Sequence, residues 1–215
     1  MHPFKVITAD NSPTLFVPEL NEHYGSVNGA LNESLHVFIE AGLHSIKDDS
    51  VSILEIGFGT GLNTLLTLMD TASSHKKIHY ETIEKFPLSS EIIDDLATET
   101  VFNNDSFRMI HNAPWNKEMK LSDTFTLKKI QIGLEHYLPK QKYNLIYFDA
   151  FSPDKQPELW TKEIFERLFN AGLQGCTLVT YSSKGSVKQA LRDAGFTVTR
   201  LKGPQGKHHM VRAIK

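Results

Sequence analysis

The chain has 215 residues, 40% of them hydrophobic and 22% charged, with a formal net charge of −2, which is ordinary for a globular protein with one sizeable core. No apolar run approaches the roughly 20 residues that cross a bilayer, the N-terminus lacks the pattern of a secretory signal, and a single cysteine excludes an internal disulfide. These features favour a cytoplasmic enzyme with no membrane partner.

Strands alternate with helices along most of the chain, which predicts a mostly parallel, doubly wound α/β sheet. Residues 1–25 should be extended, because three prolines disfavour helix there, and residues 26–43 have helical spacing. The pattern weakens over 101–126, which we interpret as a mixed insertion. The other predicted strands are 51–56, 77–84, 127–132, 143–151, 177–181, 196–201 and 208–214, and the other predicted helices are 62–72, 89–99, 157–173 and 186–196.

Three glycines, Gly57, Gly59 and Gly61, lie between a predicted strand and a predicted helix, where the backbone can approach a ligand without a Cβ in the way. A dinucleotide site prefers G-x-G-x-x-G, whereas this loop reads G-x-G-x-G. Glu55 precedes the loop, and a carboxylate there would repel a pyrophosphate but attract a sulfonium and an amino group. The pattern therefore favours S-adenosylmethionine (SAM) over NAD.

Two more carboxylates follow predicted strands. Glu84 ends the strand at 77–84, where a carboxylate can accept both hydroxyl groups of a ribose that lies across the sheet edge. Asp149 follows NLIYF and faces the crevice in which open α/β sheets bind ligands. Methyl transfer to an amine needs a neutral nitrogen and a partner that orients it or accepts its proton. Asp149 is placed for that role, and the absence of a D/N-P-P-Y/F motif favours an aliphatic amine over a base amine.

The last two predicted strands follow one another without a helix between them, so they should pair antiparallel. That ending separates a methyltransferase sheet from a plain dinucleotide-binding sheet. The sequence therefore predicts a Rossmann-like, class I SAM-dependent methyltransferase fold, with a mostly parallel seven-stranded sheet and a C-terminal antiparallel strand. We expect a single domain over 1–215, with an N-terminal extension and helix over 1–50 and the core over 51–215.

From about Tyr24 to its C-terminus the chain resembles the methyltransferase domain of MnmC. The segments that carry the resemblance are GFGTGLN at 57–63, EKFPL at 84–88, DAFSPDKQPELW at 149–160, YSSKGSVKQALRDAGF at 181–196 and KHHM at 207–210. The resemblance implies SAM-dependent N-methylation of the 5-aminomethyl group of the wobble uridine, position 34, in tRNA. It also implies coupling to the enzymes that install the aminomethyl group. With no room for a flavin-dependent domain, a stand-alone form is expected.

The resemblance further implies which residues act. Asp149 is the expected catalytic carboxylate. The expected cofactor-binding residues are Glu55, Gly57, Phe58, Gly59, Thr60, Gly61, Asn63, Glu84 and Lys85. Many related enzymes have an aspartate after the third strand, but Gly133 and Leu134 lie there, so a backbone group or Glu135 is left to contact the adenine.

The C-terminal region is basic. Residues 184–215 contain eight basic residues and one acidic residue, a net +7, so residues 1–183 carry −9. This asymmetry suggests a polyanion partner, although a solvated surface would have the same composition. With the resemblance, we expect the region to face tRNA. The expected RNA-binding residues are Lys184, Lys202, Lys207 and His208.

Other functions remain open at this point. The ten histidines form no H-E-x-x-H motif, so no metal site is predicted. A methyl- or aminopropyltransferase that acts on a free amine or polyamine is an alternative, because an acidic pocket at Asp149 would also hold that cation. A non-catalytic SAM- or RNA-binding partner protein and an NAD-linked oxidoreductase are others. Trp160 and Cys176 are predicted core residues, and Trp115 could stack on a base or cover the cofactor.

Overall fold

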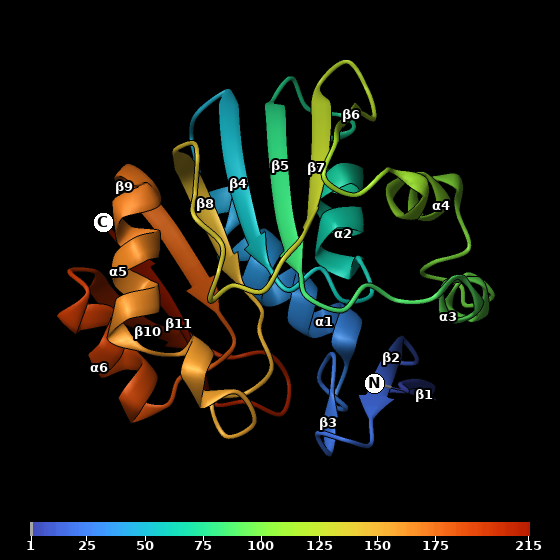
Figure 1. Cartoon of the computed structure of the whole chain (residues 1–215), viewed down its shortest axis with the longest axis horizontal. Coiled ribbons are helices and arrows are strands. Elements are labelled where there is room, and N and C mark those ends of the chain that lie inside the picture. The colour runs from blue at the N-terminus through green and yellow to red at the C-terminus, as the bar shows by residue number, and fades with distance from the viewer. Residues whose placement is uncertain (1) are drawn as a thin grey trace.

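The computed structural model describes residues 2–215 and contains an eight-stranded sheet with helices on both faces (Figure 1). Five neighbouring strands, β9-β8-β4-β5-β7, are parallel, and β11 pairs antiparallel with both β9 and β10. The predicted fold class and its antiparallel ending are confirmed. The strands of this sheet are β4 (Ser50–Ile56), β5 (Lys77–Glu84), β6 (Glu118–Lys120), β7 (Phe125–Gln131), β8 (Tyr143–Phe148), β9 (Gly172–Thr180), β10 (Thr197–Lys202) and β11 (His209–Ile214).

Helices cover the two faces of the sheet with separate apolar cores. The helices are α1 (Ala30–Ser34), α2 (Leu62–Thr71), α3 (Ser90–Leu96), α4 (Asp105–Asn112), α5 (Lys162–Ala171) and α6 (Gly185–Asp193). A π-helix, η1 (Leu35–Glu40), continues α1, and two 3-10 turns are η2 (Leu43–Ser45) and η3 (Pro157–Leu159). Within residues 2–215, no helix is long and apolar enough to cross a membrane.

The two cores follow from the alternation of side chains along the strands. In β4, Ile53 belongs to the core shared with α2, η1 and α4, whereas Leu54 belongs to the core shared with α5 and α6. Trp160 and Cys176 are buried in the second core, as predicted. A strand that is buried on both faces reads as a continuous apolar run, which is why its position was predictable.

The segment 101–126 does not behave as a loose insertion. It forms α4 and the edge strand β6, and it gives the sheet eight strands rather than the seven predicted. Phe102, Phe107 and Ile110 are fully buried, and the Asn104 side chain accepts a hydrogen bond from the backbone of Phe107 (2.9 Å), which begins α4. The sequence pattern was weak because an eight-residue helix and a three-residue strand are too short to show a clear period.

The N-terminal residues were predicted to be extended, and they form a separate three-stranded antiparallel sheet. Its strands are β1 (Phe4–Ile7), β2 (Pro13–Val17) and β3 (Glu22–His23). Lys5 of β1 reaches the carboxylates of Asp95 (2.8 Å) and Glu99 (2.6 Å) at the end of α3. In Figure 1 this small sheet lies below the carboxyl edge of the large one.

Strand order determines where a ligand can bind. From β4 the chain proceeds to β5 and β7 on one side, and then to β8 and β9 on the other, so the order switches between β4 and β8. Ile56 is paired in register with Ile83 of β5 and with Phe148 of β8. The residues that follow these three, Gly57, Glu84 and Asp149, therefore leave the sheet at the same level.

Candidate functional site

A cavity lies at this carboxyl edge. The loops after β4, β5, β7 and β8 form one side, and the N-terminal sheet with α1 forms the other. Eight of the residues expected at the site line the cavity: Gly57, Phe58, Gly59, Thr60, Asn63, Glu84, Lys85 and Asp149. Two expected residues, Glu55 and Gly61, do not line it.

The glycine loop has a backbone that only glycine adopts easily. Gly57 has φ +88°, and a Cβ there would lie 2.5 Å from the carbonyl oxygen of Asp149. Gly59 has φ +51°, and a Cβ there would lie 2.8 Å from Cδ1 of Tyr24. The Gly57 amide donates to the Ile83 carbonyl (3.1 Å), so the loop is fastened to the neighbouring strand. A side chain at either glycine would strain the backbone and collide with the neighbouring cavity residues.

Glu84 is held by the backbone. Its two carboxylate oxygens accept hydrogen bonds from the amides of Gly59 (3.1 Å) and Phe86 (2.9 Å). Burial raises the pKa of Glu84, and these amide contacts oppose the rise. Because a carboxylate has about four acceptor positions, Glu84 keeps acceptor capacity for the hydroxyl groups of a ribose.

Asp149 has a different environment. Its Oδ2 atom accepts a hydrogen bond from Nδ2 of Asn63 (2.8 Å). Burial raises the pKa of Asp149 to about 7, with Asn63 opposing the rise, Glu33 adding to it and Lys207 opposing it. A carboxyl group whose pKa lies near neutral pH can both accept and release a proton under physiological conditions.

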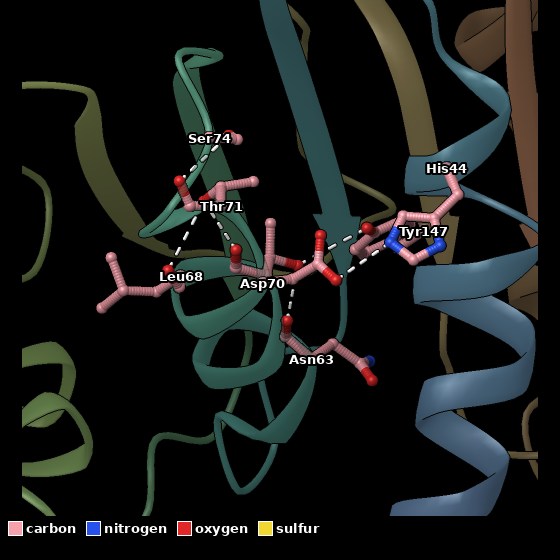
Figure 2. Close-up of polar contacts among 8 residues, drawn as sticks. His44, Asn63, Leu68, Asp70, Thr71, Ser74 and Tyr147 are labelled. Atoms are coloured by element: carbon pink, nitrogen blue, oxygen red, sulfur yellow. Dashed lines mark hydrogen bonds and ion pairs between the residues drawn. The ribbon is translucent and has the colours of Figure 1, made fainter.

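Helix α2, which carries Asn63, is fixed by its own hydroxyl groups and by the segment before β4. Thr67 Oγ1 donates to the Asn63 carbonyl (2.7 Å), and Thr71 Oγ1 donates to the Thr67 carbonyl (2.7 Å). His44 Nε2 lies 2.9 Å from Oδ1 of Asp70. Figure 2 shows these contacts along the helix. Asn63 itself lies in the first turn of this helix and lines the cavity.

An aromatic wall closes the Asp149 side. The rings of Tyr24 and Phe151 meet edge to face with centroids 5.1 Å apart. Trp160 Nε1 donates to the Phe151 carbonyl (2.8 Å), and Ser152 Oγ donates to Glu22 of β3 (2.7 Å). The N-terminal sheet is thereby tied to the loop after β8, and sequence reasoning missed this contribution because it depends on contacts between distant segments.

The cavity is acidic. Four carboxyl groups line it, and Lys85 is the single basic residue of the lining; it pairs with one of them, Glu135 (2.5 Å). Such a lining attracts a cationic ligand and disfavours a pyrophosphate. The lining carboxyl groups are Glu84, Glu135, Asp149 and Glu158. No group of three His, Cys, Asp or Glu side chains within 2–215 is arranged to hold a metal ion.

Two further residues hold the glycine loop from behind. His111 Nε2 donates to the Thr60 carbonyl (3.1 Å), and Lys129 Nζ donates to the His111 carbonyl (2.8 Å). Burial lowers the pKa of His111 to about 4 and that of Lys129 to about 8. Trp115 does not line the cavity but packs on Phe58 (centroids 5.7 Å apart), with Lys129 Nζ 4.8 Å from its ring centroid. The alternation of apolar and polar residues along β7 is the sequence signal that could have predicted a buried side chain for Lys129.

Glu55 differs from its predicted place beside the cofactor. Its side chain is 0% exposed and accepts a hydrogen bond from Thr64 Oγ1 (3.0 Å) of α2. Burial raises the pKa of Glu55 to about 8. The alternation of β4 explains this, because residues 51, 53 and 55 share the face that α2 covers. Glu55 therefore lies beneath the glycine loop.

The four expected RNA-binding residues have different environments. Lys184 pairs with Asp154, and Lys207 pairs with the buried Glu33, whereas Lys202 and His208 are exposed. Lys207 also lies over the Tyr181 ring, 4.2 Å from its centroid.

Two basic residues absent from the prediction lie beside this surface: Arg200, which is exposed, and Lys188, which is partly buried. Lys188 and Arg200 approach His209 closely enough, with His208, to lower its pKa, although burial is the larger cause.

A glycine cradle and an acidic cavity at the switch point of the sheet fit SAM, which carries an amino group and a positively charged sulfur. Residues 91–215, more than half of the chain, match the family described as S-adenosyl-L-methionine-dependent methyltransferase. The chain belongs to this family, and SAM is the family's cofactor.

Within this family, the chain is similar to the MnmC proteins of several bacteria. The chain is 31% identical over 216 residues to the tRNA 5-methylaminomethyl-2-thiouridine biosynthesis bifunctional protein MnmC of Pseudoalteromonas atlantica, covering 89% of this chain and 30% of that protein. It is 29% identical to MnmC of Legionella pneumophila strain Lens, covering 96% and 36%. The chain thus spans about a third of the length of these relatives. The resemblance to the MnmC methyltransferase domain is confirmed.

Solved structures support the fold. MNMC2 from Aquifex aeolicus superimposes with a TM-score of 0.79 at 24% identity, over 99% of this chain and 70% of that one. Spermidine synthase from Thermotoga maritima gives a TM-score of 0.55 at 12% identity, over 98% and 71%. At these identities the likeness concerns the fold alone.

Proposed function

We propose that this protein transfers a methyl group from SAM to the amine of a 5-aminomethyl group on the wobble uridine of tRNA. The observation that carries the proposal is Asp149, a carboxyl group with a pKa near 7, in an acidic cavity behind an aromatic wall. The MnmC relatives, whose name refers to biosynthesis of 5-methylaminomethyl-2-thiouridine in tRNA, support the substrate. The same proposal treats residues 1–215 as one cytoplasmic methyltransferase domain.

Different residues of the cavity would bind the cofactor, accept the proton and exclude water. When bound, SAM supplies an electrophilic methyl group. Glu84 would accept the ribose hydroxyls, and the backbone of the glycine loop would approach the methionine part. Asp149 would accept a proton from the incoming ammonium group and direct the freed lone pair into the cavity. Tyr24 and Phe151 would exclude water beside that amine and favour its cationic form on entry.

An acidic site supports an aliphatic amine as the acceptor. Such an amine is protonated at neutral pH and enters an acidic cavity as a cation, after which one carboxylate must remove the proton. A neutral base amine would need no such carboxylate and would gain nothing from the charge of Glu158 at the cavity lining.

The proposal is tested by incubating the protein with labelled SAM and tRNA that bears 5-aminomethyluridine, followed by mass analysis of the nucleosides. We expect 5-methylaminomethyluridine to appear with wild-type protein and to be nearly absent with Asp149→Asn. Parallel reactions use spermidine and putrescine as acceptors.

Methylation or aminopropylation of those amines, without product in tRNA, would replace the proposal with the polyamine alternative. The likeness to spermidine synthase concerns the fold and does not favour that outcome. Binding of SAM, measured by calorimetry in the same preparation, shows whether a negative result reflects the acceptor or an inactive protein.

A further inference from the structure

The buried Glu55 belongs to a polar cluster that the proposed chemistry does not use. Beneath the glycine loop, Oε1 of Glu55 has no hydrogen-bond partner, although Oε2 accepts from Thr64. The hydroxyl groups of Tyr80 and Thr82 in β5 are buried beside the same carboxyl group, and neither has a well-formed hydrogen bond. Unpartnered polar atoms at full burial are costly and call for a physical reason.

Asn63 connects this cluster to the cavity. Its side chain is 4% exposed; Nδ2 donates to Asp149, and Oδ1 is buried without a hydrogen-bond partner. The same side chain also lies beside Glu55. One uncharged amide therefore stands between two carboxyl groups, and within residues 2–215 neither carboxyl group takes part in an ion pair.

Electrostatics decides how these groups are protonated. Two carboxylates on either side of one buried amide repel each other, and both lose hydration, so one of them keeps its proton. Glu55 is fully buried, whereas Asp149 faces the cavity, so Glu55 is the group that stays neutral. A proton on Oε1 turns an unpartnered acceptor into a donor, and Oδ1 of Asn63 is an acceptor without a donor. One proton placed between Oε1 and Oδ1 would satisfy both atoms.

We propose that Glu55 is a positioning residue: as a neutral carboxylic acid it donates to Oδ1 of Asn63, fixes the orientation of that amide, and so directs Nδ2 toward Asp149. The part of the proposal that concerns catalysis rests on the proposed function, whereas the link from Glu55 to Asn63 stands on the geometry. Asp149 then acts as the proton acceptor in a fixed orientation beside the amine.

The surrounding titratable groups agree with this assignment. Tyr80 of β5, Tyr147 of β8 and Asp149 face Glu55, and none of them supplies a positive charge. Burial raises the pKa of both carboxyl groups, and Asp149, which lines the cavity whereas Glu55 does not, is the one that ionises more readily. The groups that act on Asp149 from other elements are Glu33, Lys207 and Tyr181.

The test uses two substitutions at one position. Glu55→Leu removes the donor to Asn63, and we expect kcat to fall at least tenfold while the Kd for SAM changes less than threefold. Glu55→Gln keeps a neutral donor of similar shape, so it should recover most of the lost rate and keep the pH midpoint of kcat within about 0.3 units of wild type, a tolerance worth about 0.4 kcal/mol. Asn63→Leu should reproduce the loss seen with Glu55→Leu.

The opposite results would overturn the inference. If Glu55 were an ionised cofactor ligand, Glu55→Gln would weaken SAM binding at least tenfold. It would also lower the pH midpoint of kcat, because removing a negative neighbour favours ionisation of Asp149. If Glu55→Leu does not fold, the comparison of Glu55→Gln with Asn63→Leu still separates the two outcomes.

A second measurement needs no acceptor. We expect the infrared difference spectrum between wild type and Glu55→Gln, each with SAM bound at pH 7, to show the C=O stretch of a protonated carboxylic acid in wild type only. Absence of that band overturns the inference even if tRNA is methylated. Its presence, with no transfer to tRNA, would keep the inference and reject the proposed function.

Discussion

Glu84 and Asp149 occupy equivalent positions on two strands that flank β4, yet their surroundings differ. Both follow a residue that is paired in register with Ile56. Glu84 accepts two backbone amides, whereas Asp149 accepts one side-chain amide and lies near the carboxyl groups of Glu33 and Glu55. The same position at a strand end thus supports two different kinds of carboxyl chemistry.

We interpret this difference as a separation of cofactor binding from proton transfer. Backbone amides cannot change their protonation or turn away, so Glu84 is suited to a constant task, accepting hydroxyl groups. Burial, with the neighbouring Glu33, raises the pKa of Asp149 to about 7, so this carboxyl group is suited to exchange a proton. If that comparison is correct, a substitution of Asp149 should lower kcat, whereas a substitution of Glu84 should raise the Kd for SAM.

The largest effect is expected for Asp149→Asn. The amide keeps the shape and one acceptor but cannot take a proton, so kcat should fall by roughly 10²- to 10⁴-fold. The Kd for SAM should change less than about threefold. Single-turnover methyl transfer and calorimetry measure the two quantities, and a Kd that rises in step with the loss of rate would contradict the separation.

Glu84→Gln should show the converse pattern. A charge-assisted hydrogen bond contributes about 1.5–3 kcal/mol, so the Kd for SAM should rise roughly 10- to 100-fold. The rate at saturating SAM should stay within about threefold of wild type. A matched control is Glu158→Gln, another carboxyl group of the lining on the Asp149 side, which should leave the Kd for SAM unchanged.

The pH dependence of kcat also distinguishes the roles of Asp149 and Glu84. Because the pKa of Asp149 is raised to about 7, kcat should increase with pH as this group ionises and level off above about pH 8. Below the midpoint the rate should fall about tenfold per pH unit. Asp149→Asn should remove this rise, whereas Glu84→Gln should keep it; a rise that persists in Asp149→Asn would assign the titration to another group.

The smallest effect is expected on the basic surface. Lys202 is exposed on β10, and Lys202→Glu should weaken tRNA binding about three- to tenfold and reduce the salt dependence of the binding constant. Lys140→Glu is a matched control, since Lys140 is exposed in the loop before β8 and thus at the opposite edge of the sheet. Equal losses in both variants at low salt would indicate a general charge effect and no local contact.

Local chemistry explains why much of the site could be predicted. Gly57 and Gly59 are required by their positive φ angles, and Glu84 and Asp149 follow apolar runs whose ends mark strand ends. Strand ends of a parallel sheet meet at one edge, so these residues gather there whatever the remaining packing. The apolar runs also identified β4 and β8, because these two central strands are buried on both faces along most of their length.

Packing between distant segments decided the rest. Glu55 lies under α2 because β4 presents alternate residues to that helix, Lys207 is held by Glu33, 174 residues away in sequence, and Tyr24 covers Gly59 because the N-terminal sheet docks against the loop. The sequence alone determined where the chain turns and which carboxyl groups reach the sheet edge, since these depend on backbone conformation and side-chain period. Tertiary structure decided how the pKa of each carboxyl group is shifted, because burial and charged neighbours depend on how the elements pack together.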